Sequence, residues 1–66
     1  MPPHQERVVT EQKELLEKMV KLREFIDSNP VFKKLDYDEQ GRLKIQRFIM
    51  EQYSAVLLDR IDNFTA

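Results

Sequence analysis

Arginine and tyrosine side chains are the groups in this 66-residue chain that are best suited to chemistry. Arg7 stands near the beginning of the sequence, and Arg47, Tyr53 and Arg60 lie in its second half. A guanidinium group offers a planar fork that pairs with phosphate oxygens and stacks on a base. A tyrosine adds a ring face and a hydroxyl group. These groups are suited to the contacts of a binding module, and the residues alone predict no particular ligand.

Three further side chains complete the set of candidate ligand-binding residues: His4, Gln5 and Lys21. The amide of Gln5 is suited to reading a polar base edge, and Lys21 adds a positive charge. Every candidate also has an ordinary structural interpretation. An aromatic residue within an apolar series more often packs against its neighbours, and a surface Arg or Lys is more often solvated or ion-paired. For Lys21 the expected partner is Glu17, four residues earlier.

Signatures of catalysis are absent from the sequence. It has no Cys, one His and no Gly-rich phosphate loop, and neither Ser28 nor Ser54 has a His near it in sequence. A structural metal needs several convergent ligands, which His4 alone cannot supply. We therefore expect a protein that binds without catalysis and needs neither a metal nor a cofactor.

Charge and hydropathy exclude several other classes of protein. The chain has 11 Lys and Arg against 12 Asp and Glu, a net charge of −1. Proteins that bind long duplex nucleic acid usually carry a basic face, whereas a small anion needs only a few well-placed cations. No apolar run approaches the roughly 18 residues of a membrane span, and the first residues lack the apolar stretch of a signal peptide. The cytoplasm is therefore the expected compartment.

The elements that must position these groups are helices. Residues 5–27 contain neither Pro nor Gly, and their apolar residues recur along one helical face. That face comprises Val8, Leu15, Met19, Leu22 and Ile26. Two Glu–Lys pairs at the (i, i+4) spacing, each worth about 0.2–0.5 kcal/mol, should stabilise this helix. They are Glu14 with Lys18 and Glu17 with Lys21.

Residues 28–36 should form a short helical corner. The residue before Pro30 is disfavoured in the α conformation, so the first helix should end there. Asn29 is suited to capping one new turn of helix with Pro30 at its first position. Asp36, with Glu39 three residues later, predicts the N-cap of a second long helix.

The second helix, expected over residues 37–64, has more apolar surface than one partner helix covers. One face comprises Leu43, Met50, Tyr53, Leu57, Ile61 and Phe64, and further apolar residues lie elsewhere around it: Ile45, Phe48, Ile49, Val56 and Leu58. Gly41 is either a weak point or a place of close backbone packing. A short corner makes two helices antiparallel. We therefore expect an all-α fold, with residues 1–66 forming one antiparallel two-helix hairpin that assembles into an oligomer to cover the surplus.

The order of residues along the chain also resembles a known family. The sequence opens with His4-Gln5-x-Arg7-Val8-Val9 and closes with Met50-x-x-Tyr53-Ser54-x-x-Leu57-x-x-Arg60-Ile61-x-x-Phe64. Over nearly its whole length the chain resembles the helical-hairpin domain of small phage proteins, including those similar to a protein of crAss-like phages. Phage anti-CBASS and anti-Thoeris sponge proteins share this hairpin.

That resemblance implies a function and a set of partners. Sponge proteins of this kind sequester the cyclic nucleotide signals of bacterial antiphage defence and do not cleave them. They assemble from hairpins into oligomers, commonly hexamers, with ligand pockets between protomers. For this chain the resemblance implies cyclic di- or trinucleotides as ligands and Arg7, Tyr53 and Arg60 as site residues. It also implies action in the cytoplasm of an infected bacterial host.

Two alternatives stay open. Members with anti-Thoeris activity carry more chain after the hairpin, which helps to form a pocket for ADP-ribose-type signals. Because this sequence stops at Ala66, we expect cyclic di- or trinucleotides instead. A protein-interaction or assembly module is the other function considered. It would bind a host or phage protein through an apolar face that includes Ile45, Phe48, Ile49 and Val56.

Overall fold

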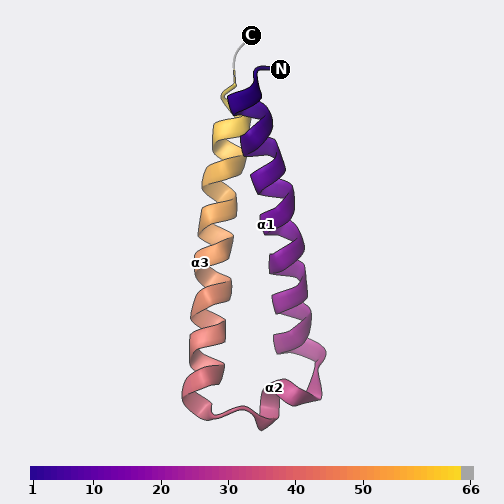
Figure 1. The fold of residues 1–66 in the computed structure, drawn as a ribbon. Coiled ribbons are helices and arrows are strands. Elements are labelled where there is room, and N and C mark those ends of the chain that lie inside the picture. Colours follow the sequence, from indigo (N-terminus) through magenta and orange to yellow (C-terminus); the bar gives the residue numbers. More distant parts are fainter. Residues whose placement is uncertain (65–66) are drawn as a thin grey trace.

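The structure is a computed structural model that describes residues 1–64, and it is a long helical hairpin (Figure 1). Helix α1 spans Pro3–Ser28, the short α2 spans Pro30–Lys34, and α3 spans Tyr37–Asp62. Helices α1 and α3 run antiparallel side by side, and α2 forms the corner between them. No strand occurs among the described residues. The predicted all-α hairpin is confirmed.

The ends of the long helices differ slightly from the prediction. Helix α1 begins at Pro3, two residues earlier than expected, and α3 ends at Asp62, two residues before the expected end. Proline is tolerated in the first helical turn because its missing N–H would have no intrahelical partner there. The carbonyl oxygen of Pro2 accepts hydrogen bonds from the backbone N–H groups of Gln5 and Glu6, at 3.0 and 3.1 Å.

The corner is held by side-chain hydrogen bonds to the backbone. Asn29 Oδ1 accepts a hydrogen bond of 2.9 Å from the backbone N–H of Val31, so the predicted cap of α2 is confirmed. Gln40 Nε2 donates to the carbonyl oxygen of Leu35, at 3.0 Å, near the end of this short helix. Phe32 is buried and meets Phe25 edge to face, with ring centroids 6.0 Å apart. These contacts fix the direction in which the chain returns.

The N-cap of α3 differs from the expected one in its chemistry. Asp36 occupies the predicted N-cap position, but its side chain makes no capping hydrogen bond. Its backbone carbonyl instead accepts from the N–H of Gln40, at 3.0 Å. The position of the helix start was therefore predicted correctly and the side-chain cap was not.

The core of the hairpin is small and lies between α1 and α3. Val8, Leu15 and Leu57 are buried, and partly buried residues pack around them: Met19, Met50, Ile61 and Phe64. Tyr53 was expected on this face, but 43% of it is exposed, and Ser54 occupies the buried position instead. Positions three and four residues after Met50 are both compatible with a helical stripe. The packing against α1 selects the fourth.

One local expectation about the helix surfaces is wrong, and the structure decides between the two alternatives for Gly41. The pairs Glu14–Lys18 and Glu17–Lys21 are not among the ion pairs of the described residues, which join Arg42 with Glu39 and Arg47 with both Asp27 and Glu51. The side chains of the expected pairs extend into solvent, where a single exposed ion pair contributes little. A Cβ added at Gly41 would meet nothing within 4 Å, so this glycine does not serve close backbone packing.

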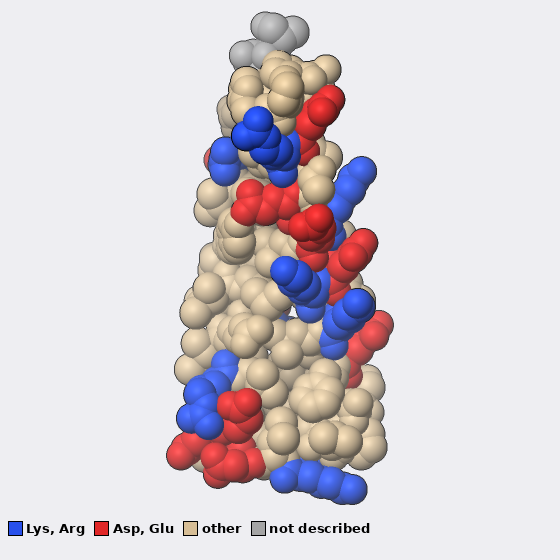
Figure 2. All heavy atoms as spheres, in the orientation of Figure 1, with Lys and Arg blue, Asp and Glu red and all other residues tan. Residues whose placement is uncertain are grey.

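The hairpin leaves much apolar surface uncovered. It measures 49 × 15 × 14 Å and exposes 5249 Å², against about 4,500 Å² for a compact monomer of its 8.0 kDa mass. Ile45, Phe48, Ile49 and Val56 are each 58–61% exposed, as the surplus apolar pattern predicted. Figure 2 shows an uncharged surface over the middle of α3, whereas charged side chains gather along α1. No helix among residues 1–64 has an apolar stretch that would suffice to cross a membrane.

Candidate functional site

A buried polar pair sets the register between the two long helices. Gln12 Nε2 donates a hydrogen bond of 3.0 Å to Ser54 Oγ, and both residues are buried. Every buried side-chain polar atom among the described residues has a hydrogen-bond partner. Residue 12 is therefore level with residue 54, and residues near 7 lie level with residues near 59. Sequence reasoning missed this pair, although Gln12 fills the gap between Val8 and Leu15 on the apolar face.

This register brings Arg7 and Arg60 to the same end of the hairpin. Each of them precedes a residue of the core by one position, Arg7 before Val8 and Arg60 before Ile61. Equal rotations about two antiparallel helices lead to the same side of the pair, because the second helix is viewed from its opposite end. Arg7 and Arg60 thus share one flank as well as one end. Figure 2 shows basic side chains at this end of the molecule, with acidic side chains beside them.

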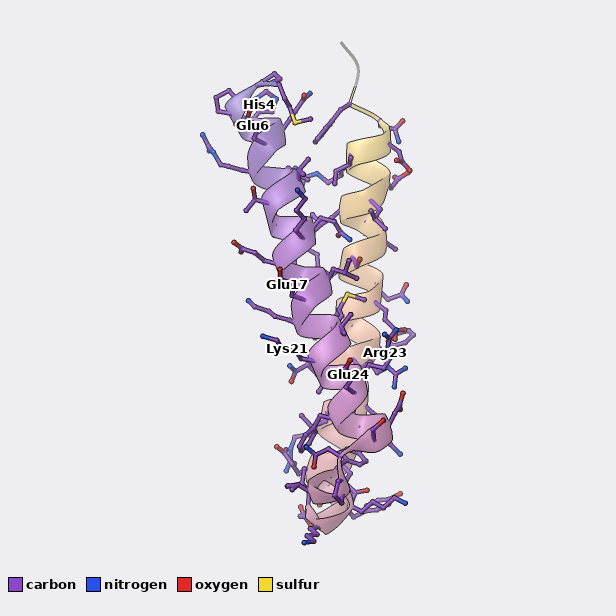
Figure 3. All side chains as sticks on the ribbon, turned by 90° about the vertical axis from the view of Figure 1, so that its right-hand side faces the viewer. His4, Glu6, Glu17, Lys21, Arg23 and Glu24 are labelled. Atoms are coloured by element: carbon purple, nitrogen blue, oxygen red, sulfur yellow. The ribbon has the colours of Figure 1, made fainter. Side chains whose placement is uncertain are left out.

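These two arginines are free to bind an anion from outside the chain. Both residues are exposed, and neither forms an ion pair with any of residues 1–64. His4 is exposed and Gln5 half-buried at the same end, where Figure 3 labels His4. Tyr53 lies two helical turns from Arg60, about 10 Å along α3, with its ring partly exposed. Five of the seven predicted site residues therefore lie in the terminal half of the hairpin.

The other two predicted site residues are not brought to this place. Lys21 is about 21 Å along α1 from Arg7, and Figure 3 shows it far from His4. Arg47 lies near the corner, where its Nη1 is 3.2 Å from Asp27 Oδ1 and its Nε is 3.2 Å from Glu51 Oε1. In one hairpin, a small ligand at Arg7 and Arg60 does not reach either residue.

The hollows around these cations are shallow and open. Arg7 lines one on α1 that it shares with Glu6, Glu11 and Glu14. Lys21 lines a different one beside α2, and Arg47 lines a third between the long helices. The three acidic neighbours oppose the approach of an anion across the outer face of α1. Enclosure of a ligand at this end would require surface from another molecule.

The chemistry available at this end is binding by charge, hydrogen bonding and stacking. Residues 1–64 contain no group of three or more His, Asp and Glu side chains that could hold a metal ion. Ser54 is the buried hydroxyl near this end, and its Oγ is engaged by Gln12. Arg and Tyr hold phosphates and bases without a covalent step.

Comparison with known families shows to which family the chain belongs. The family model described as Sequestin matches residues 2–63. The chain belongs to the Sequestin family. No curated protein and no solved structure matches it significantly.

The name of the Sequestin family indicates proteins that bind and sequester a ligand, as opposed to enzymes that convert one. At this level the match agrees with the resemblance to sponge proteins. It also agrees with the exposed Arg7 and Arg60, which are available to a ligand because neither forms an ion pair among the described residues.

Proposed function

We propose that this chain is a phage immune-evasion protein that binds cyclic di- or trinucleotide messengers of bacterial antiphage defence and sequesters them uncleaved. It would act in the cytoplasm of the infected host. The observation that carries the proposal is the pair Arg7 and Arg60, which share one end and one flank and have no ion pair among residues 1–64. Family membership supports a sequestering role.

The pair supplies the positive charge that an anion site needs, although Glu6, Glu11 and Glu14 line the same hollow as Arg7. Two guanidinium groups on one flank repel each other, and a phosphate between them converts that repulsion into two charge-assisted contacts. Tyr53, on α3, offers a ring face for a base. Gln5 and His4 supply hydrogen-bond donors and acceptors at the same end.

Assembly would supply the enclosure that one hairpin lacks. A cyclic nucleotide carries a phosphate on each of two or three sides, so copies arranged around it would present the same arginine repeatedly. A protomer with a net charge of −1 would then bind an anion tightly, because the cations of several copies converge. Lys21 and Arg47 would contribute only where they belong to another copy. We propose a homo-oligomer, and the resemblance favours a hexamer.

Isothermal titration calorimetry against a panel of cyclic di- and trinucleotides tests the proposal. We expect binding with less than one ligand per protomer, and recovery of intact ligand by mass spectrometry after the protein is denatured. Arg7→Gln and Arg60→Gln should each weaken binding about 10- to 100-fold, the effect of removing a charge-assisted hydrogen bond. Lys13→Gln is the matched control, because Lys13 is exposed elsewhere on α1.

The outcomes separate the ligand classes. Unchanged affinity in both arginine variants would remove the assignment of the site. Cyclic ADP-ribose is titrated beside the panel, and heat with this compound alone would keep a sequestering function and change its ligand. Recovery of a cleaved nucleotide would overturn sequestration.

A protein-interaction module is the second candidate, and the exposed apolar residues of α3 favour it. Ile45, Phe48, Ile49 and Val56 form a surface of the kind that docks another protein. This function predicts no heat with any nucleotide and capture of one defined host or phage protein. Substituting Ile49 would abolish that capture, while substituting Arg7 would leave it unchanged.

A further inference from the structure

Helix α3 carries a second seam of side chains on the face that points away from α1. Six residues follow one another at steps of three, four, three, four and three: Arg42, Ile45, Ile49, Gln52, Val56 and Asp59. All six are exposed, and the three apolar ones are 58–60% exposed. Alternating steps of three and four are the spacing by which one helix packs lengthwise on another. We call these six residues the outer seam.

The spacing between positions of the outer seam is the same when read from either end. Its members form three symmetric pairs: Arg42 with Asp59, Ile45 with Val56, and Ile49 with Gln52. A helix turned end for end therefore offers each residue a counterpart at the same height. At both ends of the seam, that counterpart carries the opposite charge.

From this symmetry we infer that the outer seam packs antiparallel against the outer seam of a second copy of this chain. The contact has two-fold symmetry, with Arg42 of each copy facing Asp59 of the partner subunit. The inference concerns the contact between copies and does not depend on the proposed nucleotide ligand. It names the occupant of a surface that one hairpin leaves open.

The charges select the antiparallel arrangement over the parallel one. In a parallel pair each Arg42 would face Arg42 of the partner subunit, and each Asp59 would face Asp59 of the partner subunit. Like charges placed opposite one another disfavour an interface, whereas the antiparallel pair has two attractive contacts. Glu39 engages only Nε of Arg42, at 2.8 Å, so the terminal guanidinium nitrogens stay available for the carboxylate of Asp59.

The polar residue within the seam fixes its alignment. Residues 52 of the two copies would lie about 4.5 Å apart along the axis, on either side of the two-fold axis. Two amides at that separation are able to hydrogen bond to each other. A slip by one heptad in one direction would bury each Gln52 against Val56 of the partner subunit without a polar partner, which costs free energy. A slip in the other direction would place Gln52 opposite Arg42 of the partner subunit and separate both Arg42–Asp59 contacts. A single polar residue in such a seam commonly specifies the register in this way.

Engineered cysteines test the arrangement directly, because the chain contains no Cys. In the antiparallel pair, residue 45 lies beside residue 56 of the partner subunit but about 16 Å from residue 45 of the partner subunit. A disulfide forms only when the two Cα atoms are within about 7 Å. We therefore expect Ile45→Cys and Val56→Cys to form few disulfide dimers separately. An equimolar mixture of the two should form a mixed dimer, readily seen on a non-reducing gel.

Two further variants complete the experiment. Gln52→Cys alone should form a disulfide dimer, because its copies lie close to the two-fold axis. Glu17→Cys, exposed on α1, is the control and should form none at the same protein concentration. Self-linking of Ile45→Cys would overturn the antiparallel arrangement. A mixture that links no better than its single components, or a wild-type chain that stays monomeric in light scattering, would overturn the contact itself. No nucleotide is present, so a different linking pattern would overturn this contact alone and leave the ligand proposal standing. A monomeric wild-type chain would also remove the enclosure by several copies that the ligand proposal requires.

Discussion

Helices α1 and α3 each have 26 residues and pack against each other, yet their outer faces differ. The outer face of α1 is charged, and Figure 3 shows Glu17, Lys21 and Glu24 among its projecting side chains. The outer face of α3 carries exposed Ile45, Ile49 and Val56. One apolar stripe suffices for a helix that packs on one neighbour. The difference shows that α3 leaves a second apolar face exposed, and we propose that another copy of the chain covers it.

The largest effect should come from the inner face of α3. Leu57 is 1% exposed and its neighbour Leu58 is 48% exposed, so the two compare identical changes on different surfaces. Leu57→Ala should reduce the free energy of unfolding by about 2–5 kcal/mol, because it leaves a cavity in a small core. Leu58→Ala should cost less than about 1 kcal/mol, since little is buried there. Urea unfolding followed by circular dichroism, at one protein concentration, measures both. Equal losses would show that the flank of α3 is as enclosed as its core.

The next effect concerns the outer faces. Ile49→Asp should raise the dissociation constant between copies by about 100-fold or more, because each interface would bury two carboxylates in place of two isoleucines. Lys13→Asp, on the charged outer face of α1, should leave it nearly unchanged. Sedimentation or light scattering over a dilution series gives both constants. If Ile49→Asp left the mass of the assembly unchanged, the outer face of α3 would contribute no more to self-association than the outer face of α1.

A smaller effect should come from the polar pair inside the hairpin. Ser54→Ala leaves the amide of Gln12 buried without its partner, so we expect a loss of about 1–3 kcal/mol. In the double variant Gln12→Leu/Ser54→Ala, both polar groups are gone, and the loss should be smaller than the sum of the single losses. Additive losses in this cycle would mean that the two side chains do not act as a pair.

The smallest effect should be a gain at the beginning of α3. Gly41 lies inside a helix, has an ordinary φ, and has open space around its position. Gly41→Ala should therefore stabilise the hairpin by about 0.5–1 kcal/mol, because alanine loses less backbone entropy on folding. Thermal unfolding of the two proteins, side by side, checks the sign. A loss of stability would show that another backbone approaches this part of α3.

Much of the hairpin follows from the spacing of apolar residues and from the residues that end or begin a helix. The apolar repeats and the Asn29-Pro30 step predict two helices and a corner, and the structure confirms both. The choice between Tyr53 and Ser54 for the buried position could not be predicted. A helical stripe accepts a step of three or four residues, and only the packed partner decides between them. A buried Ser bonded to a Gln has no hydropathy signal, so the Gln12–Ser54 pair also stayed hidden.

The candidate site was predictable in part. Antiparallel helices place Arg7 and Arg60 at one end, and the rise per residue places Lys21 and Arg47 far from it. The ion pairs of Arg47 with Asp27 and Glu51 depend on how the helices are rotated, which periodicity alone does not give. Whether copies of the chain gather these cations around one ligand depends on contacts between chains, so it stays a proposal.

The two ends of the 49 Å hairpin differ in how freely a label could be attached to them. Helix α1 begins and helix α3 ends at the end that carries Arg7 and Arg60, whereas α2 lies at the other (Figure 1). A fluorophore, affinity tag or surface linker joined to either terminus would therefore crowd the proposed ligand end from outside. The exposed Val31 of α2 is a better point of attachment, since a dye there stands a hairpin's length away. A labelled protein of that design would serve as a reporter of nucleotide signals in solution.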